Sequence, residues 1–496
     1  MTHLSDPLSS SVARQPDATA FQFGDQRVSY GRFGRDVAAV ASRLIAGGVQ
    51  AGETVGVFIG QPAEHWCVLL ALMRVGAVSV SLTSRHEAEI DALPGLTTIV
   101  FGGETPPACP RSVRLLSIAA DWLDPDANPG VSLPSASQAD AAAGRICFTS
   151  GSVGRPKAIY LDAGRLGIRL SKTAERSRLN ARSVLWCGLG PDSAYGFTAT
   201  LAAWREGGKI VFTRRSDDLK SALVAGGVNV VISSPSALHA ILNSSSQARF
   251  EGPTIVAGSP ISPALRDRLL RDLCSEVLVA YGSSETGGVT LADAVAIDGH
   301  PGAVGRPFSD VQVQVVDKGL PLPAGVPGQV RIRSRSQVPS YLDDPLSTAV
   351  HFVDGWFYPG DVGVITPAGG LNLLARESDI LNVDGVKLSG SDIDAAVRQQ
   401  PGVQDVAAVP IVDPSGRVRL AIALVASEEA ARVLSGTIRA VMLGLPHFSL
   451  VQVSRIPRSS MGKVNRNEFG RLLSQALANR GSKENEVHIE ADHSPG

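Results

Sequence analysis

The chain has few cysteine residues, and their positions suggest no pairing. Five occur among 496 residues, at positions 67, 109, 147, 187 and 274, and none forms a C-x-x-C motif. An odd number of widely spaced cysteines argues against a disulfide framework. We therefore expect reduced, buried thiols in a cytoplasmic protein.

An excess of charge is also missing, because 46 basic residues face 47 acidic ones and the formal net charge is −1. Such a chain creates no global field that would attract nucleic acid or an anionic membrane. Residues 1–15 lack the apolar core of a secretion signal. The longest apolar segment, 67–82, is too short to cross a membrane and contains Arg74. We expect neither a nucleic-acid partner nor a membrane span.

What the chain does contain is a regular alternation of strand and helix patterns, over a length that implies two or three domains. Gly24-Asp25 marks a hairpin within residues 19–30. Apolar spacing predicts the elements that follow, which are a helix at 29–48, a strand at 55–59, a helix at 64–75 and a strand at 76–80. This order is typical of a parallel sheet covered by helices.

The sequence pattern changes twice after residue 80. Residues 83–143 are irregular, and 132–143 has the composition of a low-complexity linker. Alternation then resumes, with strands predicted at 209–213, 228–232 and 254–257 and helices at 219–226 and 236–242. From residue 302, period-two strands separated by Gly/Pro turns, at 311–316, 330–334 and 362–366, indicate a small antiparallel β subdomain.

The last part of the chain is predicted to be a compact α+β unit. Its helices are expected at 393–399 and 428–443, and its strands at 403–412 and 420–425. Residues 480–496 are polar and poor in apolar side chains, so we expect disorder there.

The stretch with the strongest chemical signal is 148–157, which follows the apolar run 146–148. Its glycines allow backbone N–H groups to turn toward an anion, three hydroxyls add donors, and Lys157 adds a positive charge. The loop is not a Walker motif, because Arg155-Pro156 separates the last glycine from the lysine. Taken alone, such a loop is commonly an ordinary surface turn.

The residue order T-S-G-S-x-G-x-P-K nevertheless resembles the phosphate-binding signature T-S-G-T-T-G-x-P-K-G of the adenylate-forming superfamily. That superfamily includes acyl-CoA synthetases, adenylation domains of nonribosomal peptide synthetases, and luciferases. The chain departs from the signature at Ser152, Val153 and Ala158. The resemblance implies that ATP phosphates are held by Thr149, Ser150, Gly151, Ser152, Gly154 and Lys157.

A second motif, at 279–287, places an aromatic residue, a glycine and an acid after an apolar strand. Taken alone, this is an ordinary turn with a solvated glutamate. It resembles the family motif Y-G-x-T/S-E, which implies that Tyr281 stacks on adenine and Ser284 contacts the phosphate or the substrate carboxylate. Glu285 would hold Mg²⁺, an ion that binds one or two carboxylates together with phosphate oxygens.

The resemblance also implies an acyl pocket. Gly258 and Ser259 match a small-residue turn whose backbone lines the adenine and the acyl group, although a plain β-α turn is equally compatible. Residues 190–197 match the acyl-pocket segment, and the implied lining residues are Tyr195, Gly196, Gly258 and Gly282.

The identity of the acid stays open. Amino-acid-activating relatives hold the substrate ammonium with an aspartate in this region, and Asp192 is a candidate for that role. Counting back from the strand at 209 instead places Ala194 at the aspartate position. We favour a carboxylic acid without an amino group.

Two further motifs precede the last part of the chain. Residues 355–361 resemble G-W-F-x-T-G-D, whose aspartate, here Asp361, binds both ribose hydroxyls; an isolated Gly-Asp turn would only cap its own backbone. Residues 374–388 resemble the family's hinge motif and make Arg376 a ribose and phosphate contact. Ser378 occupies the hinge position, where the family has Asp or Lys, and Gly385 matches the glycine beside the thiol channel.

The fifth motif lies at 455–466 and matches P-R-x-x-x-G-K-x-x-R at every fixed position. Taken alone, a basic cluster near a C-terminus is commonly a solvated face. The resemblance makes Lys463 the catalytic lysine, which bridges the substrate carboxylate and the α-phosphate region.

Five motifs in the family's order predict an α/β fold with two domains. A large domain, 1–375, would consist of helix-covered sheets with the β subdomain at about 302–375. A hinge at 376–378 would join it to a small, mobile α+β domain at 379–476, followed by a tail at 477–496.

The implied function is ATP- and Mg²⁺-dependent activation of a carboxylic acid, followed by transfer to a thiol. CoA is the expected acceptor, and the phosphopantetheine arm of a carrier protein is the alternative. No carrier-domain sequence follows residue 476, so we expect a free-standing enzyme. A nucleotide-binding homologue without catalysis is a third hypothesis, and the oligomeric state stays open.

Overall fold

The structure is a computed structural model of the chain. It describes residues 4, 6–83, 90, 93–103, 105–118, 122, 131–149, 157–214, 217–244, 246–300, 302–376, 379–383, 386–413, 417–427, 448–458, 464–479 and 486–487. Within these ranges no helix has both the length and the apolar character that crossing a membrane requires. The mixed α/β architecture predicted from the sequence is confirmed.

A first, mostly parallel sheet of eight strands forms one half of the N-terminal part. Its order is β14-β13-β12-β11-β9-β10-β1-β2, and only the β1–β2 and β13–β14 pairs are antiparallel. The strands are β1 (Thr19–Phe23), β2 (Gln26–Ser29), β9 (Val184–Cys187), β10 (Lys209–Phe212), β11 (Val230–Ser233), β12 (Pro253–Ala257), β13 (Glu276–Ser283) and β14 (Gly287–Asp293).

A second sheet has six strands in the order β6-β5-β3-β4-β7-β8, parallel except for the β7–β8 hairpin. They are β3 (Thr54–Phe58), β4 (Val78–Ser81), β5 (Leu96–Phe101), β6 (Arg114–Ser117), β7 (Gly144–Thr149) and β8 (Lys157–Asp162). The predicted hairpin at 19–30 is confirmed, but it belongs to the first sheet. The expectation of one parallel sheet built from residues 19–80 is therefore wrong, because β1 pairs with β10 rather than with β3.

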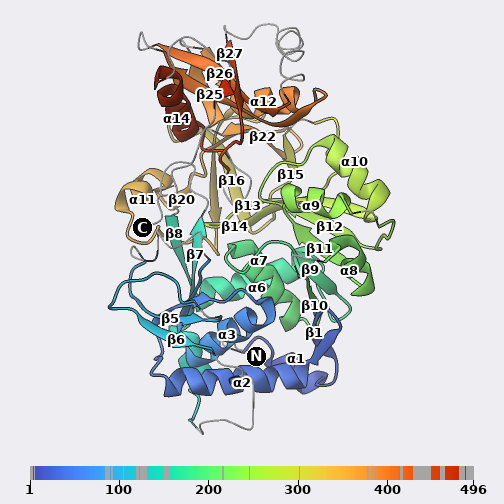
Figure 1. Ribbon diagram of the computed structural model, residues 1–496, viewed down its shortest axis with the longest axis vertical. Coiled ribbons are helices and arrows are strands. Elements are labelled where there is room, and N and C mark those ends of the chain that lie inside the picture. The colour runs from blue at the N-terminus through green and yellow to red at the C-terminus, as the bar shows by residue number, and fades with distance from the viewer. Residues whose placement is uncertain are drawn as a thin grey trace.

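The main core is formed by both sheets together with five helices. They are α1 (Ser9–Arg14), α2 (Tyr30–Ala46), α3 (Pro62–Val75), α6 (Ala163–Arg176) and α7 (Ala194–Arg205). Figure 1 shows α6 and α7 between the sheets, with α8 (Leu219–Ala225), α9 (Pro235–Leu242) and α10 (Pro263–Asp272) covering the outer side of the first sheet. Trp204 of α7 is fully buried, packs edge-on against Trp66 of α3, and donates its indole N–H to Ala20 of β1.

Local sequence explains where the central helices begin and end. Ser29 accepts a hydrogen bond from the Arg32 amide at the start of α2. Gln61 does the same for α3, whose first residue is Pro62, and Gly76 ends that helix with a φ of 81°. These caps satisfy terminal backbone groups that have no partner within their own helix.

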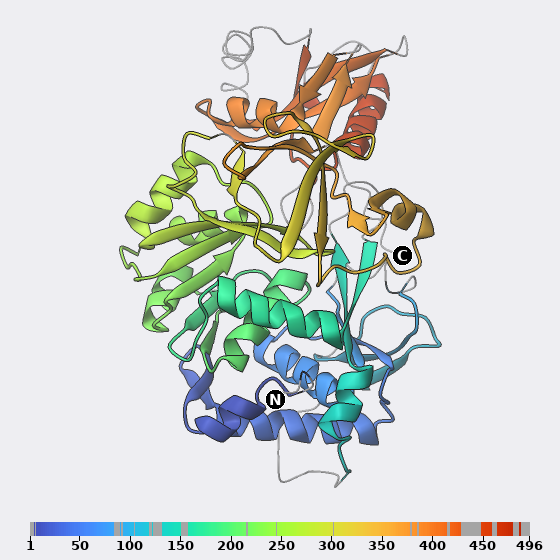
Figure 2. The same cartoon turned by 180° about the vertical axis from the view of Figure 1, so that it is seen from behind.

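Beyond residue 302 the chain forms an antiparallel sheet of short strands, in line with the period-two pattern there, and we call this sheet the β subdomain. Figure 2 shows its yellow strands between the first sheet and the C-terminal unit. Its elements are β15 (Ala303–Gly305), β16 (Val311–Asp317), β17 (Leu320–Pro321), β18 (Gly328–Ser334), α11 (Pro345–His351), β19 (Phe352–Val353), β20 (Trp356–Phe357), β21 (Asp361–Ile365) and β22 (Leu371–Arg376).

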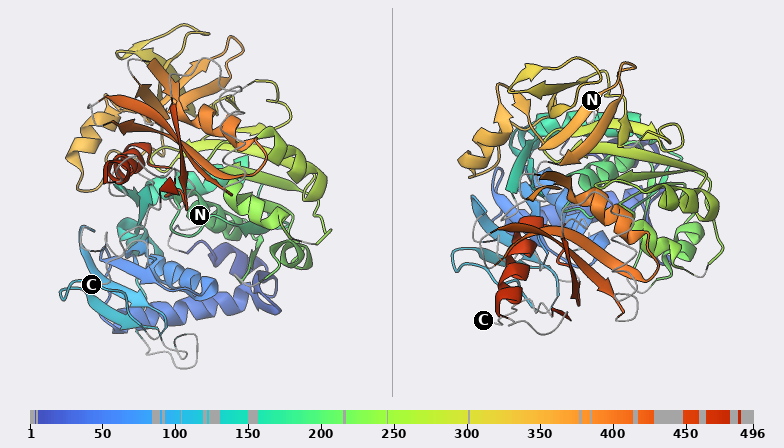
Figure 3. Two further views of the ribbon diagram at one scale, coloured as in Figure 1. Left: turned by 45° about the horizontal axis from the view of Figure 1, so that its top comes forward. Right: turned by 90° about the horizontal axis from the view of Figure 1, so that it is seen from above.

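The C-terminal unit has a four-stranded sheet, in the order β25-β26-β27-β28, with a helix on each face. Figure 3 shows this unit from two further directions. Its core is divided into two apolar clusters, one under α12 and one under α14. Its elements are β23 (Ile380–Val383), β24 (Val386–Ser389), α12 (Gly390–Arg398), β25 (Val403–Val412), β26 (Val418–Ala426), β27 (Phe448–Val453), α14 (Arg466–Asn479) and β28 (Glu486–Val487).

Two segments differ from the sequence-based expectation. The supposed linker at 132–143 contains helix α5 (Ala136–Ala142), which begins with a capping box formed by Ser135 and Gln138. The segment assigned to a tail from residue 477 includes the end of α14 and strand β28, which pairs in parallel with β27. The helix predicted at 428–443 lies outside the described residues.

Candidate active site

The carboxyl ends of β9, β11, β12 and β13 meet at one edge of the first sheet, because these strands are parallel neighbours. Ala257 is the register partner of Ala280, so Gly258 and Tyr281 follow from adjacent positions. Gly258 has a φ of 89°, a conformation that suits glycine. The carboxyl edge of a parallel sheet is where open α/β folds bind ligands. The predicted segments that follow β9, β12 and β13, namely 190–197, 258–259 and 281–285, therefore lie at one site.

Lys157 lies at the start of β8, directly opposite Thr149 at the end of β7. The two residues are register partners, so the loop between them is closed at its base. Thr149 is buried, whereas Lys157 is half-buried. The intervening predicted residues Ser150, Gly151, Ser152 and Gly154 lie outside the described part of the chain.

Lys157 and Glu285 face the same tyrosine. The Lys157 ammonium lies 4.8 Å from the centre of the Tyr341 ring, and the Tyr341 hydroxyl donates to Glu285 Oε1 at 2.9 Å. Burial lowers the pKa of Lys157, although the nearby Asp344 and Glu285 carboxylates oppose that shift. A cation, a phenol and a carboxylate that is 7% exposed are thus combined at the site.

Arg169 fixes the backbone that carries Glu285. This buried guanidinium donates to the carbonyl oxygens of Ser284 at 2.8 Å, Glu285 at 3.1 Å and Ser336 at 2.9 Å. Burial lowers its pKa to about 10, so the group stays charged at neutral pH. The 284–285 turn is therefore held by α6 and by the β subdomain at the same time.

Asp361 forms the centre of a second polar cluster. Its carboxylate is 4% exposed, accepts the Tyr281 hydroxyl at 2.6 Å, and accepts Arg376 Nε at 2.9 Å. Asp361 and Arg376 are register partners on β21 and β22, which explains why the motifs that contain them lie together. Each carboxylate oxygen can accept more than one hydrogen bond, so this group retains capacity for two vicinal hydroxyls.

The segment 190–197 begins α7 and depends on glycine for close packing. Ser193 caps the helix by accepting the Gly196 amide at 3.1 Å. A Cβ atom at Gly196 would lie 2.4 Å from the Leu189 carbonyl oxygen, so a side chain there would displace the loop. Burial raises the pKa of Tyr195 to about 12, and the phenol stays neutral. Gly282 is similarly constrained, since its Cβ would lie 2.4 Å from the Gly287 carbonyl oxygen.

Arg145 is a buried cation that supports the same segment from β7. It is 0% exposed, and its Nη2 donates to Ser81 Oγ at 2.7 Å and to the Pro191 carbonyl oxygen at 2.6 Å. Its guanidinium carbon lies 4.5 Å from the centre of the Phe197 ring. Arg145 therefore contacts both ends of the 190–197 segment.

Three residues of this site were missed from the sequence, namely Tyr341, Arg169 and Arg145. Tyr341 reaches the site because it forms an isolated bridge with Ile159 of β8. Arg145 carried a detectable signal, since a charged residue interrupts an apolar strand. No local pattern marks Arg169, which acts on carbonyl groups more than a hundred residues away.

Besides the residues of the 150–154 loop, three further predicted residues lie outside the described part of the chain, and these are Ser378, Gly385 and Lys463. Ser259 is described and follows Gly258, at the carboxyl edge of the sheet. Within the described ranges, no three His, Cys, Asp or Glu side chains come together as a metal site. A cation held by Glu285 would need phosphate oxygens or water as its other ligands.

The sequence profile of the family described as AMP-binding enzyme matches residues 8–342. The chain belongs to this family. The match covers both sheets, Lys157, Glu285 and Tyr341. As an AMP-binding enzyme, the chain is an adenylate-forming ligase.

Relatives in the AMP-binding family cover almost the whole chain. Triostin synthetase I from Streptomyces triostinicus is 27% identical over 93% of each chain. The 4-chlorobenzoate–CoA ligase of an Arthrobacter species is 26% identical over 96% of each chain. The solved structure of O-succinylbenzoate coenzyme A synthetase from Bacillus subtilis, in complex with ATP and magnesium ion, is 16% identical and has a TM-score of 0.79, covering 94% of this chain and 99% of its own.

Proposed function

We propose that this AMP-binding enzyme joins a carboxylic acid to the thiol of CoA in two steps. The first step converts the acid and ATP into an acyl-adenylate and pyrophosphate. The second transfers the acyl group to the thiol and releases AMP. The observation that most supports this function is the convergence of Lys157, Glu285, Asp361 and Arg376 around the carboxyl edge of one sheet.

In the first step a carboxylate oxygen attacks the α-phosphorus of ATP, and pyrophosphate leaves. Nucleophile and leaving group are both anionic, so catalysis depends on positive charge fixed around them. Lys157 would meet the pyrophosphate end, and Lys463 would meet the reacting carboxylate. Asp361 would orient the ribose, with Arg376 beside it. No general base is required, since a carboxylic acid is already ionised at neutral pH.

The residues present fit a bound Mg²⁺ ion. Glu285 is buried and held by Arg169 through its backbone, and within the described ranges its carboxylate accepts one hydrogen bond, at Oε1. Its other oxygen is available to a cation. When bound, Mg²⁺ supplies positive charge to the phosphate oxygens.

In the second step we propose that the C-terminal domain, 379–476, pivots about the 376–378 hinge at Ser378. This motion would withdraw Lys463 and bring the Gly385 segment toward the large domain, 1–375. The thiol then attacks the acyl carbon, and AMP leaves with the oxygen that had attacked phosphorus. The backbone at Ser378 can absorb such a rotation without a specific side chain.

The acid is proposed to lack an amino group. An ammonium ligand must present an uncompensated carboxylate to the substrate, and Asp192 does not meet this condition well. Its Oδ1 folds back over Gly190, so close that a Cβ atom added to Gly190 would lie 2.2 Å from it. Asp192 also lies in the field of the buried Arg145 cation. The acyl pocket would be lined by Tyr195, Gly196, Gly258 and Gly282.

Transfer to the phosphopantetheine arm of a carrier protein is the second candidate. It presents the same thiol as CoA, and relatives named as a synthetase and as a CoA ligase match at similar identity. The first experiment is ATP–pyrophosphate exchange with a panel of aryl, fatty, dicarboxylic and amino acids. The best acid is then tested with CoA and with a holo-carrier protein as acceptor.

Acid-dependent exchange followed by formation of a CoA thioester is the expected result. Exchange with transfer only to the carrier would select the second candidate. Absence of exchange with every acid would contradict the proposal and leave a homologue that binds nucleotide without catalysis.

Arg145→Met is expected to raise the KM for the acid about tenfold while the KM for ATP changes little. The Pro191 carbonyl would lose its donor and the Phe197 ring its cation, so the 190–197 segment would be held less precisely. Initial exchange rates over both substrate concentrations measure the two constants. Arg249→Met is the control, because Arg249 also donates to main-chain carbonyls but at Leu270, Arg271 and Cys274, away from this edge. Equal KM increases for both substrates would contradict the assignment.

A further inference from the structure

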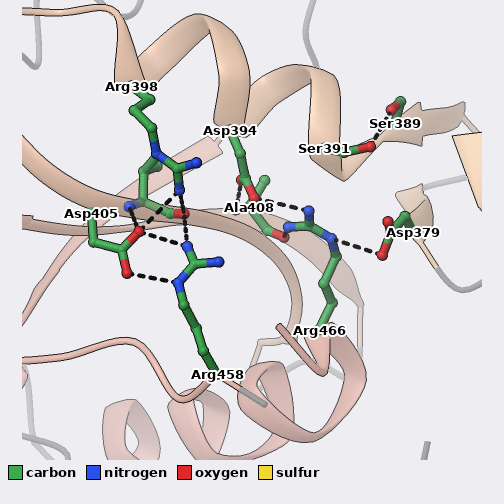
Figure 4. A network of polar contacts seen from close by, with 10 residues as sticks. Asp379, Ser389, Ser391, Asp394, Arg398, Asp405, Ala408, Arg458 and Arg466 are labelled. Atoms are coloured by element: carbon green, nitrogen blue, oxygen red, sulfur yellow. Dashed lines mark hydrogen bonds and ion pairs between the residues drawn. The ribbon is translucent and has the colours of Figure 1, made fainter. Parts of the chain in front are cut away.

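Two arginines bracket Lys463 in the sequence, and both bind the same edge of β25. Arg458 lies five residues before the lysine and Arg466 three residues after it. We propose that they are positioning residues, which hold the two ends of the lysine-bearing segment on β25 during acyl-adenylate formation. Figure 4 shows both guanidinium groups with their carboxylate partners.

The β25 edge explains why arginine and aspartate occur in pairs here. Within the described ranges β25 pairs with β26 alone, so no strand pairs with the backbone N–H and C=O groups of its other edge. Asp405 accepts the Val406 amide at 2.9 Å, and Asp394 accepts the Ala408 amide at 2.6 Å. Arginines donate to the carbonyl oxygens of the same two residues. Each Arg–Asp pair thus takes the place of a missing neighbouring strand.

Arg466 is the more deeply buried of the two anchors, with 6% of its surface exposed. It donates to the Ala408 carbonyl oxygen at 2.8 Å, to Asp394 Oδ2 at 2.8 Å and to Asp379 Oδ1 at 3.4 Å. A Cβ atom at Gly390 would lie 2.7 Å from Arg466 Nε, so glycine makes room for the guanidinium. Arg466 therefore joins the start of α14 to α12, to β25 and to Asp379, the residue after the proposed hinge.

Arg458 forms a two-point contact with Asp405. Its Nε donates to Oδ2 at 2.9 Å and its Nη2 to Oδ1 at 2.6 Å, while Nη2 also lies 3.2 Å from the Val406 carbonyl oxygen. Such paired contacts fix the orientation of a guanidinium as well as its position. Although burial alone would raise the pKa of Asp405, the hydrogen bond and charge of Arg458 hold it below its usual value.

The two anchoring points are close together. Val406 and Ala408 are two positions apart on one strand, so their carbonyl groups point the same way and lie roughly 7 Å apart. The chain is therefore bound to β25 at Arg458 and returns to nearly the same place at Arg466. Asn465 completes the return by capping α14, where its Oδ1 accepts the Glu468 amide at 3.3 Å. Fixing both ends of a short segment limits the positions that Lys463 can sample.

This inference rests on the proposed function, in which Lys463 acts in the first step alone. A misplaced catalytic group loses rate steeply with distance, so loosening either anchor should slow acyl-adenylate formation. The same loosening should leave the second step unchanged, because Lys463 is withdrawn from the site at that stage. Arg466 also supports the domain core, whereas Arg458 is partly exposed, which makes Arg458 the better residue to replace.

Arg398 provides a matched control for the experiment. Its Nη2 donates to the same Asp405 oxygen at 3.0 Å and lies 3.4 Å from the same Val406 carbonyl oxygen. It is located on α12, however, and has no short covalent connection to Lys463. If only the local ion pairs matter, Arg398→Met and Arg458→Met should have equal effects.

The test measures both half-reactions of the full-length protein with its best acid. Arg458→Met is expected to reduce ATP–pyrophosphate exchange about 10- to 100-fold. Conversion of a supplied acyl-adenylate to thioester should stay within about twofold, and Arg398→Met should leave both rates near wild type. In a Lys463→Ala background, Arg458→Met should cause no further loss, because the two residues act through one group.

The contrary outcomes distinguish failure of the positioning role from failure of the proposed function. If Lys463→Ala loses exchange but Arg458→Met does not, or if Arg398→Met matches Arg458→Met, the positioning role is wrong while the proposed function stands. A further loss in the double variant would also contradict the positioning role. If wild type shows no acid-dependent exchange, the proposed function itself fails.

Discussion

Replacing Lys463 with alanine is expected to reduce acyl-adenylate formation about 100- to 1,000-fold, which is the usual consequence of removing one preorganised charge from a transition state. The reason is that the attacking carboxylate and the α-phosphate are both anionic, and Lys463 is the cation proposed to bridge them. Formation of thioester from a supplied acyl-adenylate should change by about twofold or less, because phosphorus chemistry is already complete at that point.

The measurement is ATP–pyrophosphate exchange for the first step and thioester formation from purified acyl-adenylate for the second. Gly385→Trp provides the reciprocal variant, since bulk in the thiol channel should block the second step and spare the first. Equal losses in both steps for Lys463→Ala would show that the lysine has no step-specific role.

The second large effect is expected from Glu285→Gln, which should reduce the exchange rate about 100-fold or more at ordinary Mg²⁺ concentration. Glutamine has the shape of glutamate and its amide oxygen can still accept the Tyr341 hydroxyl, so the local packing should persist. The negative charge that would hold the metal ion is lost. The concentration of Mg²⁺ needed for half-maximal activity should therefore rise.

Asp344→Asn is the matched control for this charge. Asp344 also lies near Lys157, but its side chain caps α11 by accepting the Ser347 amide at 2.9 Å, and asparagine can cap equally well. Exchange should be titrated with Mg²⁺ for wild type and both variants. If Glu285→Gln requires no more Mg²⁺ than Asp344→Asn, Glu285 does not hold the ion.

Local patterns were sufficient to predict most elements but not the sheets to which they belong. The hairpin at 19–29 has a turn signal of its own, whereas its place in the first sheet depends on pairing between Phe21 and Ile210. That pairing joins residues far apart in sequence, and no periodicity reports it. Helix α5 was missed for a different reason, because a composition rich in Ser and Ala concealed the S-x-x-Q capping signal at Ser135.

The residues of the candidate site also fall into two groups, those that a local motif marks and those that only the folded chain brings to the site. Glu285, Asp361 and Arg376 lie within short motifs, so a resemblance over a few residues located them. Tyr341 and Arg169 contribute through contacts with residues more than fifty positions away, and they became visible only in three dimensions. The β25 edge shows the same dependence, since Asp405 and Arg458 are separated by 53 positions.

The central claim is that a carboxylate oxygen of the substrate attacks the α-phosphorus of ATP. The most direct test uses an acid labelled with ¹⁸O in its carboxylate, incubated with the enzyme, ATP, Mg²⁺ and CoA. Mass spectrometry of the products should find one ¹⁸O atom in AMP for each thioester formed, with none in pyrophosphate. Label in inorganic phosphate or pyrophosphate, or AMP without label, would contradict attack at the α-phosphorus and with it the proposed acyl-adenylate.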